Sequence, residues 1–131
     1  MIVVDSSVWI ALLRGAANVA AKKFEIIEAG DTDEILVGDL VLLEVLQGAR
    51  SDAHAALIEE RLRAFRVEAM LDAGLATIVA RNFRFLRERG VIIRKTAGLI
   101  IATFCIERAH RLLHDDRDFE AVAQHLPLAI F

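Results

Sequence analysis

Three acidic residues stand at positions where a carboxylate could do chemistry. Asp5 ends the apolar run at residues 2–4, and Asp116 follows another short apolar segment. Glu44 lies one turn inside a predicted helix that follows a third apolar run. In open parallel α/β sheets, ligands bind outside the carboxyl ends of the strands. The spacing therefore makes Asp5, Glu44 and Asp116 candidates for one shared crevice.

Carboxylates held close together repel one another and resist joint ionisation unless a cation lies between them. Mg²⁺ or Mn²⁺ suits such oxygen ligands and keeps several of its waters. One or two such ions can orient water and stabilise an in-line phosphoryl displacement. The alternative is that these acids are helix caps and surface residues that never meet. Asp5 in particular is well placed to cap the helix that follows it.

Polar neighbours of these acids add two further candidates. Ser7 could hydrogen-bond a carboxylate or a metal-bound water, or it could cap the helix beside Asp5. Asp118 is a candidate auxiliary metal ligand, with helix capping or pairing with an arginine as the alternative. His114 also adjoins the acids, but a lone histidine is more often a packed or exposed side chain than a ligand.

The elements that position these residues alternate between short strands and helices. Apolar runs predict strands at residues 2–4, 35–37, 112–113 and 128–130. Helical patterns cover residues 7–14, 17–29, 51–66, 71–89 and 97–109, and one further helix begins near residue 40 with Asp39 as its N-cap. Strands separated by helices imply a parallel sheet with right-handed crossovers. We therefore predict a three-layer α/β/α sandwich with a central parallel sheet.

Composition limits the class of protein. The length of 131 residues fits one domain, residues 1–131, with one core. The apolar content is 56%, yet no apolar stretch reaches the roughly 18 residues that span a bilayer. Cys105 is the only cysteine, so no internal disulfide is expected. These features indicate a cytoplasmic protein with no membrane segment, whose apolar excess could cover a subunit or partner interface.

Several segments together resemble a known family. They are VVDSSVW (residues 3–9), DLVLLEVLQG (residues 39–48), IRKT (residues 93–96), IATFCIE (residues 101–107) and LLHDDRDF (residues 112–119). The chain resembles PIN-domain nucleases nearly end to end and, more narrowly, VapC-type toxins of bacterial toxin–antitoxin pairs. The resemblance implies a Mg²⁺-dependent endoribonuclease, usually dimeric, that is inhibited by a VapB-type antitoxin and reaches operator DNA only through that antitoxin.

The resemblance also assigns roles to individual residues. Asp5 matches the first acid of the family, Glu44 the second and Asp116 the last, which makes them the expected catalytic and metal-binding residues. The third acid should stand three residues before the segment IAT, where this chain has Gly98. A glycine near a helix start costs about 0.5–1 kcal/mol relative to alanine and supplies no ligand.

Gly98 leaves two explanations open. The chain is either an inactivated form or a natural variant that works with fewer ligands. We expect activity to be reduced or abolished. A non-catalytic protein that binds an antitoxin or acts with it as a corepressor is the alternative function. A phosphatase of the haloacid-dehalogenase type would need a second aspartate two residues after Asp5, where Ser7 stands.

Basic residues gather in one part of a chain whose net charge is −3. Such a net charge excludes polyanion binding by bulk charge. We predict contact with the RNA backbone by a local set of side chains: Arg81, Arg84, Arg87, Arg94 and Lys95. The alternatives are a solvated helix face or pairing with an acidic antitoxin segment. No aromatic platform is visible, so no sequence preference for RNA can be derived.

Overall fold

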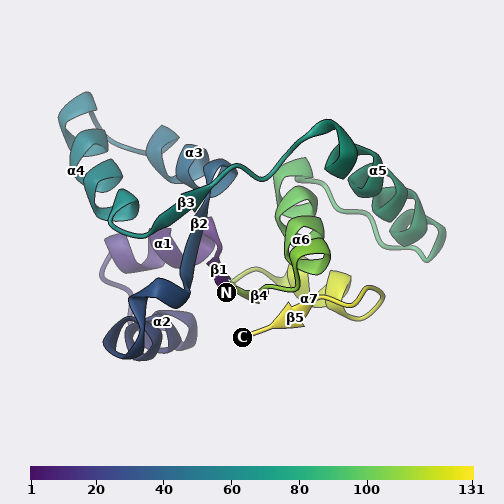
Figure 1. Cartoon of the computed structure of the whole chain (residues 1–131), viewed down its shortest axis with the longest axis horizontal. Helices are drawn as coiled ribbons and strands as arrows, with labels where there is room; N and C mark the ends of the chain where they lie inside the picture. Colours follow the sequence, from purple (N-terminus) through teal and green to yellow (C-terminus); the bar gives the residue numbers. More distant parts are fainter.

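The computed structural model describes residues 1–131. Five parallel strands form one sheet in the order β3-β2-β1-β4-β5 (Figure 1). The strands are β1 (Ile2–Val4), β2 (Ile35–Gly38), β3 (Arg66–Glu68), β4 (Arg111–Leu113) and β5 (Ala129–Ile130). The first strand of the sequence therefore lies at the centre of the sheet, between the next strand, β2, and β4, which comes much later in the sequence.

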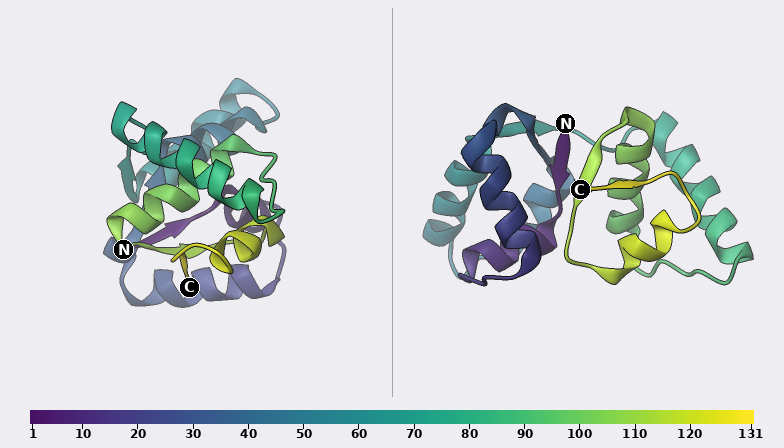
Figure 2. Two further views of the ribbon diagram at one scale, coloured as in Figure 1. Left: turned by 90° about the vertical axis from the view of Figure 1, so that its right-hand side faces the viewer. Right: turned by 90° about the horizontal axis from the view of Figure 1, so that it is seen from below.

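Seven α-helices connect and cover the strands. They are α1 (Ser6–Leu13), α2 (Val19–Gly30), α3 (Asp39–Gln47), α4 (Asp52–Arg63), α5 (Ala73–Glu88), α6 (Thr96–Arg108) and α7 (Arg117–Ala123), with one 3₁₀ turn at Thr32–Glu34. Figure 2 shows α1 to α4 on one side of the sheet and α5 to α7 on the other. The predicted three-layer α/β/α sandwich is confirmed. No helix is both long enough and apolar enough to cross a membrane.

The apolar runs predicted as strands form the strands because both faces of a parallel sheet are covered by helices. All three residues of β1 are buried. In the sheet, Val4 of β1 stands beside Leu113 of β4, and the Asp5 N–H donates to the Leu113 carbonyl over 2.9 Å. This register brings the residues that follow β1 and β4 to the same edge.

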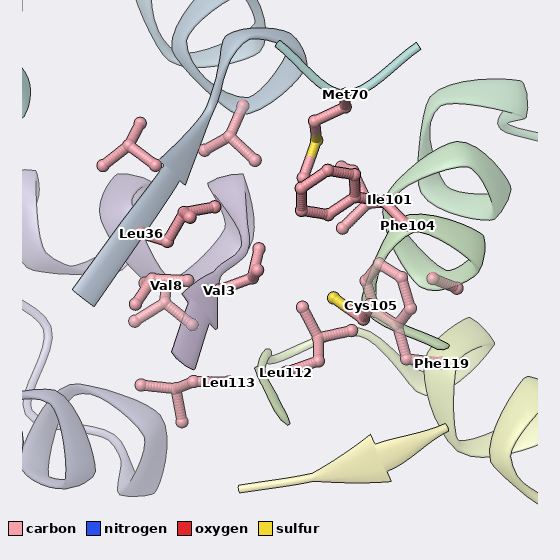
Figure 3. Packing of buried hydrophobic residues seen from close by; sticks show 14 of the residues in the cluster. Val3, Val8, Leu36, Met70, Ile101, Phe104, Cys105, Leu112, Leu113 and Phe119 are labelled. Carbon is pink, nitrogen blue, oxygen red and sulfur yellow. The ribbon is translucent and has the colours of Figure 1, made fainter. Parts of the chain in front are cut away.

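One apolar core of 32 buried residues occupies both sides of the sheet. In Figure 3, Ile101, Phe104 and Cys105 of α6 lie between their helix and the sheet. Burial raises the pKa of the Cys105 thiol to about 12, so this thiol stays protonated and acts as a small apolar group. On the other side, the Trp9 ring lies 4.9 Å from the Phe24 ring, centroid to centroid.

The structure corrects several predicted boundaries. The strand β3 was not predicted, because an edge strand with two charged residues carries no apolar run. The helix expected to reach residue 66 ends at Arg63, since Arg66 already belongs to β3. The short helix α7 was missed as well. Asp39 is not the N-cap of α3 but its first residue, and Gly38 is the cap.

Gly38, the cap residue of α3, packs closely against the side chain of Met70. A Cβ at this position would overlap the side chain of Met70, which is buried against the end of β2. Asp39 links the start of α3 to the segment that follows β3. Its Oδ1 accepts hydrogen bonds from the N–H groups of Leu40, at 2.8 Å, and Met70, at 3.0 Å.

Candidate active site

A cavity of about 180 Å³ lies at the carboxyl edge of the sheet, where β1 and β4 end. Four carboxylates line it together with one ammonium group. Its lining residues are Asp5, Ser6, Ser7, Ile10, Glu44, Ile93, Lys95, Gly98, Asp116, Asp118, Phe119 and Val122. Every predicted acid is therefore brought to one place. The position of the absent acid, Gly98, is there too.

Asp5 is held in place by the start of α1. The residue is 5% exposed and caps the helix, with its Oδ2 accepting from the Ser7 N–H at 3.0 Å and from the Ser7 hydroxyl at 2.6 Å. The Ser7 Oγ in turn accepts from the Asp115 N–H at 3.0 Å, which links the ends of β1 and β4. Asp5 thus caps α1 and also lines the cavity. Ser7 acts as a brace behind the carboxylate.

Glu44 reaches the cavity from α3. Its Oε1 lies 3.4 Å from the Ser6 hydroxyl, which donates a hydrogen bond to it. Burial raises the pKa of Glu44, and the negative charge of Asp5 raises it further, while Ser6 and Lys95 act in the opposite direction. Burial and the neighbouring carboxylates of Asp5 and Asp116 together disfavour the charged form of Glu44 more than Ser6 and Lys95 favour it.

Asp116 caps α7 at the end of β4. Its Oδ1 accepts from the Asp118 N–H at 2.9 Å, and its own N–H donates to His114 Nδ1 at 3.1 Å. His114 packs its ring 5.1 Å from the Phe119 ring, and its Nε2 lies 3.1 Å from Glu120 Oε1. The histidine thus supports the backbone of Asp116 and does not line the cavity. Asp118 does line it and forms no ion pair.

Gly98 lies in the first turn of α6, facing the cavity. A Cβ built there would meet only Phe119 Cζ, at the ordinary contact distance of 3.9 Å. The fold therefore has room for a side chain where this chain has none.

The cavity's donors suit a metal ion in type but are not gathered around one point. Carboxylate and hydroxyl oxygens are the ligands that hard divalent ions prefer. However, no three His, Cys, Asp or Glu side chains are arranged to hold a metal ion. Gly98 lines the cavity but adds no carboxylate to it. A cation bound in the cavity would favour the charged form of Glu44, whose pKa is raised.

The predicted basic set divides in two. Lys95 lines the cavity, and Arg94 precedes it on the surface without lining it. The arginines of α5 are exposed on the side of that helix opposite the buried Leu75 and Val79: Arg81, Arg84 and Arg87. Arg81 and Arg87 belong to a solvated helix face, whereas Arg84 also lines an apolar groove between α5 and α6. RNA contact by these residues stays a prediction.

Sequence reasoning missed Ser6 and the apolar walls of the cavity. Ser6 is buried beside Asp5. Its place directly after an acid at the end of a strand was the one sequence feature that could have indicated a role in the site. Ile10 and Ile93 flank the carboxylates from α1 and from the segment before α6. Nothing in their sequence pattern distinguishes them from core residues.

Comparison with known proteins decides the family, because residues 2–124 match the PIN domain. The chain belongs to the PIN-domain family. Ribonuclease VapC11 of Mycobacterium tuberculosis is 25% identical to it over 124 residues, which is 95% of this chain and 92% of the relative. The resemblance to VapC-type proteins read from the motifs is confirmed.

Solved structures share the fold of this PIN domain. VapBC2 from Rickettsia felis, bound to a DNA fragment from its promoter, contains a chain that superposes with a TM-score of 0.76 at 17% identity, covering 100% of this chain and 98% of that one. VapC20 of Mycobacterium tuberculosis, described as a sarcin-ricin loop cleaving toxin, gives 0.66 at 19% identity, with coverage of 92% and 94%. PIN-domain nucleases generally use divalent metal ions.

Replacing Glu44 by Gln should stabilise this PIN domain near pH 7 in the absence of metal. A raised pKa means that the folded state holds the Glu44 proton more tightly than the unfolded state does. Stability is therefore lost as the pH rises from the unfolded to the folded pKa, and the neutral amide avoids that loss. We expect Tm in EDTA to rise by about 1–2 °C at neutral pH, with the difference vanishing below about pH 4.

Glu25→Gln is the matched control for this measurement, because Glu25 is exposed on α2 and forms no ion pair. It should leave Tm unchanged across the same pH range. A Glu44→Gln variant that is less stable than the parent at neutral pH would show that the carboxylate is stabilising and that the charge in the cavity is not crowded.

Proposed function

We propose that this PIN domain is a Mg²⁺- or Mn²⁺-dependent endoribonuclease toxin of a type II toxin–antitoxin pair, with its activity reduced or abolished by Gly98. The observation that carries the proposal is the convergence of Asp5, Glu44 and Asp116 on one cavity together with the gap at Gly98. The relatives add support, since VapC11 is named a ribonuclease and VapC20 a sarcin-ricin loop cleaving toxin.

In this proposal, Asp5, Glu44 and Asp116 hold the ion, and Asp118 is an auxiliary ligand. The ion, when bound, activates water and neutralises charge that develops on the scissile phosphate. Ser7 keeps the Asp5 carboxylate in its orientation through the 2.6 Å hydrogen bond. Lys95 offers the one cationic group of the cavity to a phosphate.

RNA cleavage by this chain and by its Gly98→Asp variant tests the nuclease proposal. A non-catalytic protein that binds an antitoxin, or represses with it, is the second candidate. The observation in its favour is that no three acidic side chains are arranged to hold a metal ion. Failure of both forms to cleave any RNA would favour this second candidate.

The proposal also includes partners: an RNA substrate, a VapB-type antitoxin, and operator DNA reached through the antitoxin alone. A groove of about 470 Å³ between α5 and α6 is lined mainly by apolar side chains, and Ile93 lines both this groove and the acidic cavity. An antitoxin segment with an apolar helix face fits this groove, and an arginine of that segment could reach the carboxylates. The proposed location is the cytoplasm.

We expect a homodimer, because large apolar side chains remain exposed on α1 to α4 and on the segments that flank α5: Leu13, Val19, Ile26, Leu43, Leu57, Leu71 and Ile92. Apolar side chains gathered in one place mark interaction sites, and Leu71 lines the apolar groove between α5 and α6. Light scattering at increasing concentration should give twice the mass of the 14.5 kDa chain. A mass that stays at one chain at high concentration would contradict the dimer.

A further inference from the structure

A second cavity adjoins the acidic one on the side of α1. Its volume is about 390 Å³, and it lies between the C-terminal ends of α1 and α3 and the helix α4. Ile10 lines both cavities, and Glu44 of the acidic cavity is followed directly by Val45 of the second one. The two cavities are therefore neighbours that share a wall.

The charge of the second cavity is opposite to that of the first. All of its ionisable lining residues are basic: Arg14, Arg50 and His54. Neither arginine forms an ion pair with a carboxylate of this chain, and both are exposed. His54 Nδ1 accepts from the Arg50 N–H at 3.1 Å, so the proton of the neutral ring lies on Nε2, which is left as a donor. The cavity thus offers three side chains that can donate hydrogen bonds to an anion.

The place of this basic cavity relative to the sheet suggests its role. It belongs to the α1–α4 layer, whereas Arg94 and Lys95 precede α6 in the opposite layer (Figure 2). Lys95 lines the acidic cavity itself, and the basic cavity shares the Ile10 wall of the acidic cavity on the side of α1. A polyanionic strand that crosses the carboxylates is repelled by them, and cationic groups on both sides offset this repulsion.

We propose that Arg14, Arg50 and His54 bind phosphates of an RNA strand on one side of the acidic cavity, while Arg94 and Lys95 bind it on the other. This inference rests on the proposed function, since it names how the substrate lies across that same site. An RNA strand is favoured over an acidic peptide because the basic cavity shares the Ile10 wall with the cavity that is proposed to cleave RNA.

The test is RNA binding without cleavage, in EDTA, measured by fluorescence anisotropy with a labelled single-stranded RNA of about 12 nucleotides over a series of KCl concentrations. Each phosphate contact contributes about 0.7 to the slope of log K against log salt concentration for single strands. Arg14→Ala/Arg50→Ala should lower the slope by about 1.4 and weaken binding about tenfold or more near 0.1 M salt.

Lys22→Ala/Arg61→Ala is the matched control, because it removes two exposed charges that line no cavity. It should change the affinity less than about threefold and leave the slope nearly unchanged, since distant exposed charges are screened. An equal loss in both double variants overturns the inference. Arg14→Lys/Arg50→Lys should keep the parental slope, which shows that charge rather than folding is responsible.

Two outcomes separate this inference from the proposed function. If the parent chain binds RNA and Arg14→Ala/Arg50→Ala binds it equally well, only the inference fails. Weaker binding of a polyglutamate peptide by the same variant would then assign the cavity to an acidic protein. If the parent chain binds no single-stranded RNA at low salt, the proposed function fails together with the inference.

Discussion

Gly98→Asp is expected to raise RNA cleavage by this PIN domain by at least about 10–100-fold, the range typical of disturbing even an outer partner of a metal site. The new carboxylate would enter the acidic cavity from the first turn of α6. Its Cβ would have only an ordinary contact with Phe119, so the backbone has room for the first atom of the side chain. At present no three acidic side chains are arranged to hold one metal ion, and the added carboxylate would supply a further ligand.

Cleavage of total RNA with Mg²⁺, with and without EDTA, measures this effect, and growth arrest on expression without antitoxin gives a second readout. Asp5→Ala added to Gly98→Asp should abolish both. Equal activity of the parent and Gly98→Asp would refute inactivation by Gly98. A Gly98→Asp protein that is inert toward every RNA and harmless to cells would give the lead to the non-catalytic function.

Trp9→Ala should lower the free energy of unfolding by about 3–5 kcal/mol. Trp9 is 1% exposed, and its ring contacts the rings of Phe24 and Phe65 with centroid distances of 4.9 and 5.5 Å. Its indole N–H has no hydrogen-bond partner, so the loss comes from packing and the cavity left behind. Urea unfolding measures the change.

Leu13→Ala is the control on the same helix, because Leu13 is 38% exposed and should cost about 1 kcal/mol or less. Trp9→Phe should fall between the two, since it keeps part of the ring contacts and removes the unpaired donor. If Trp9→Ala costs no more than Leu13→Ala, the three-ring cluster of α1, α2 and Phe65 contributes little to stability.

The central strands were predictable because burial on both faces demands continuous apolar runs, as in β1 and β2. The edge strand β3 was not, since Arg66 and Glu68 pair with each other beside solvent and leave no apolar run. The N-cap of α3 was misplaced by one residue. Asp39 has the side chain of a cap, but it lies inside the helix, where its Oδ1 binds the N–H groups of Leu40 and Met70.

The acids of the site could be predicted because strand ends in a parallel sheet share one edge. The gap at Gly98 came only from resemblance, since a glycine shows no chemistry of its own. The basic cavity was invisible in the sequence. Arg50 and His54 are neighbours at the connection from α3 to α4, and only the packing of α1 against α3 and α4 brings Arg14 to them.

The central place of β1 has a consequence for synthesis of the chain. Asp5 leaves the ribosome early, but its cavity needs Asp116, which is more than a hundred residues later and is aligned by pairing of β1 with β4. At about 5–20 residues per second, several seconds separate the two. A partly made chain therefore carries a lone strand-end acid and no cavity. The message being translated is not exposed to a finished site on its own unfinished product.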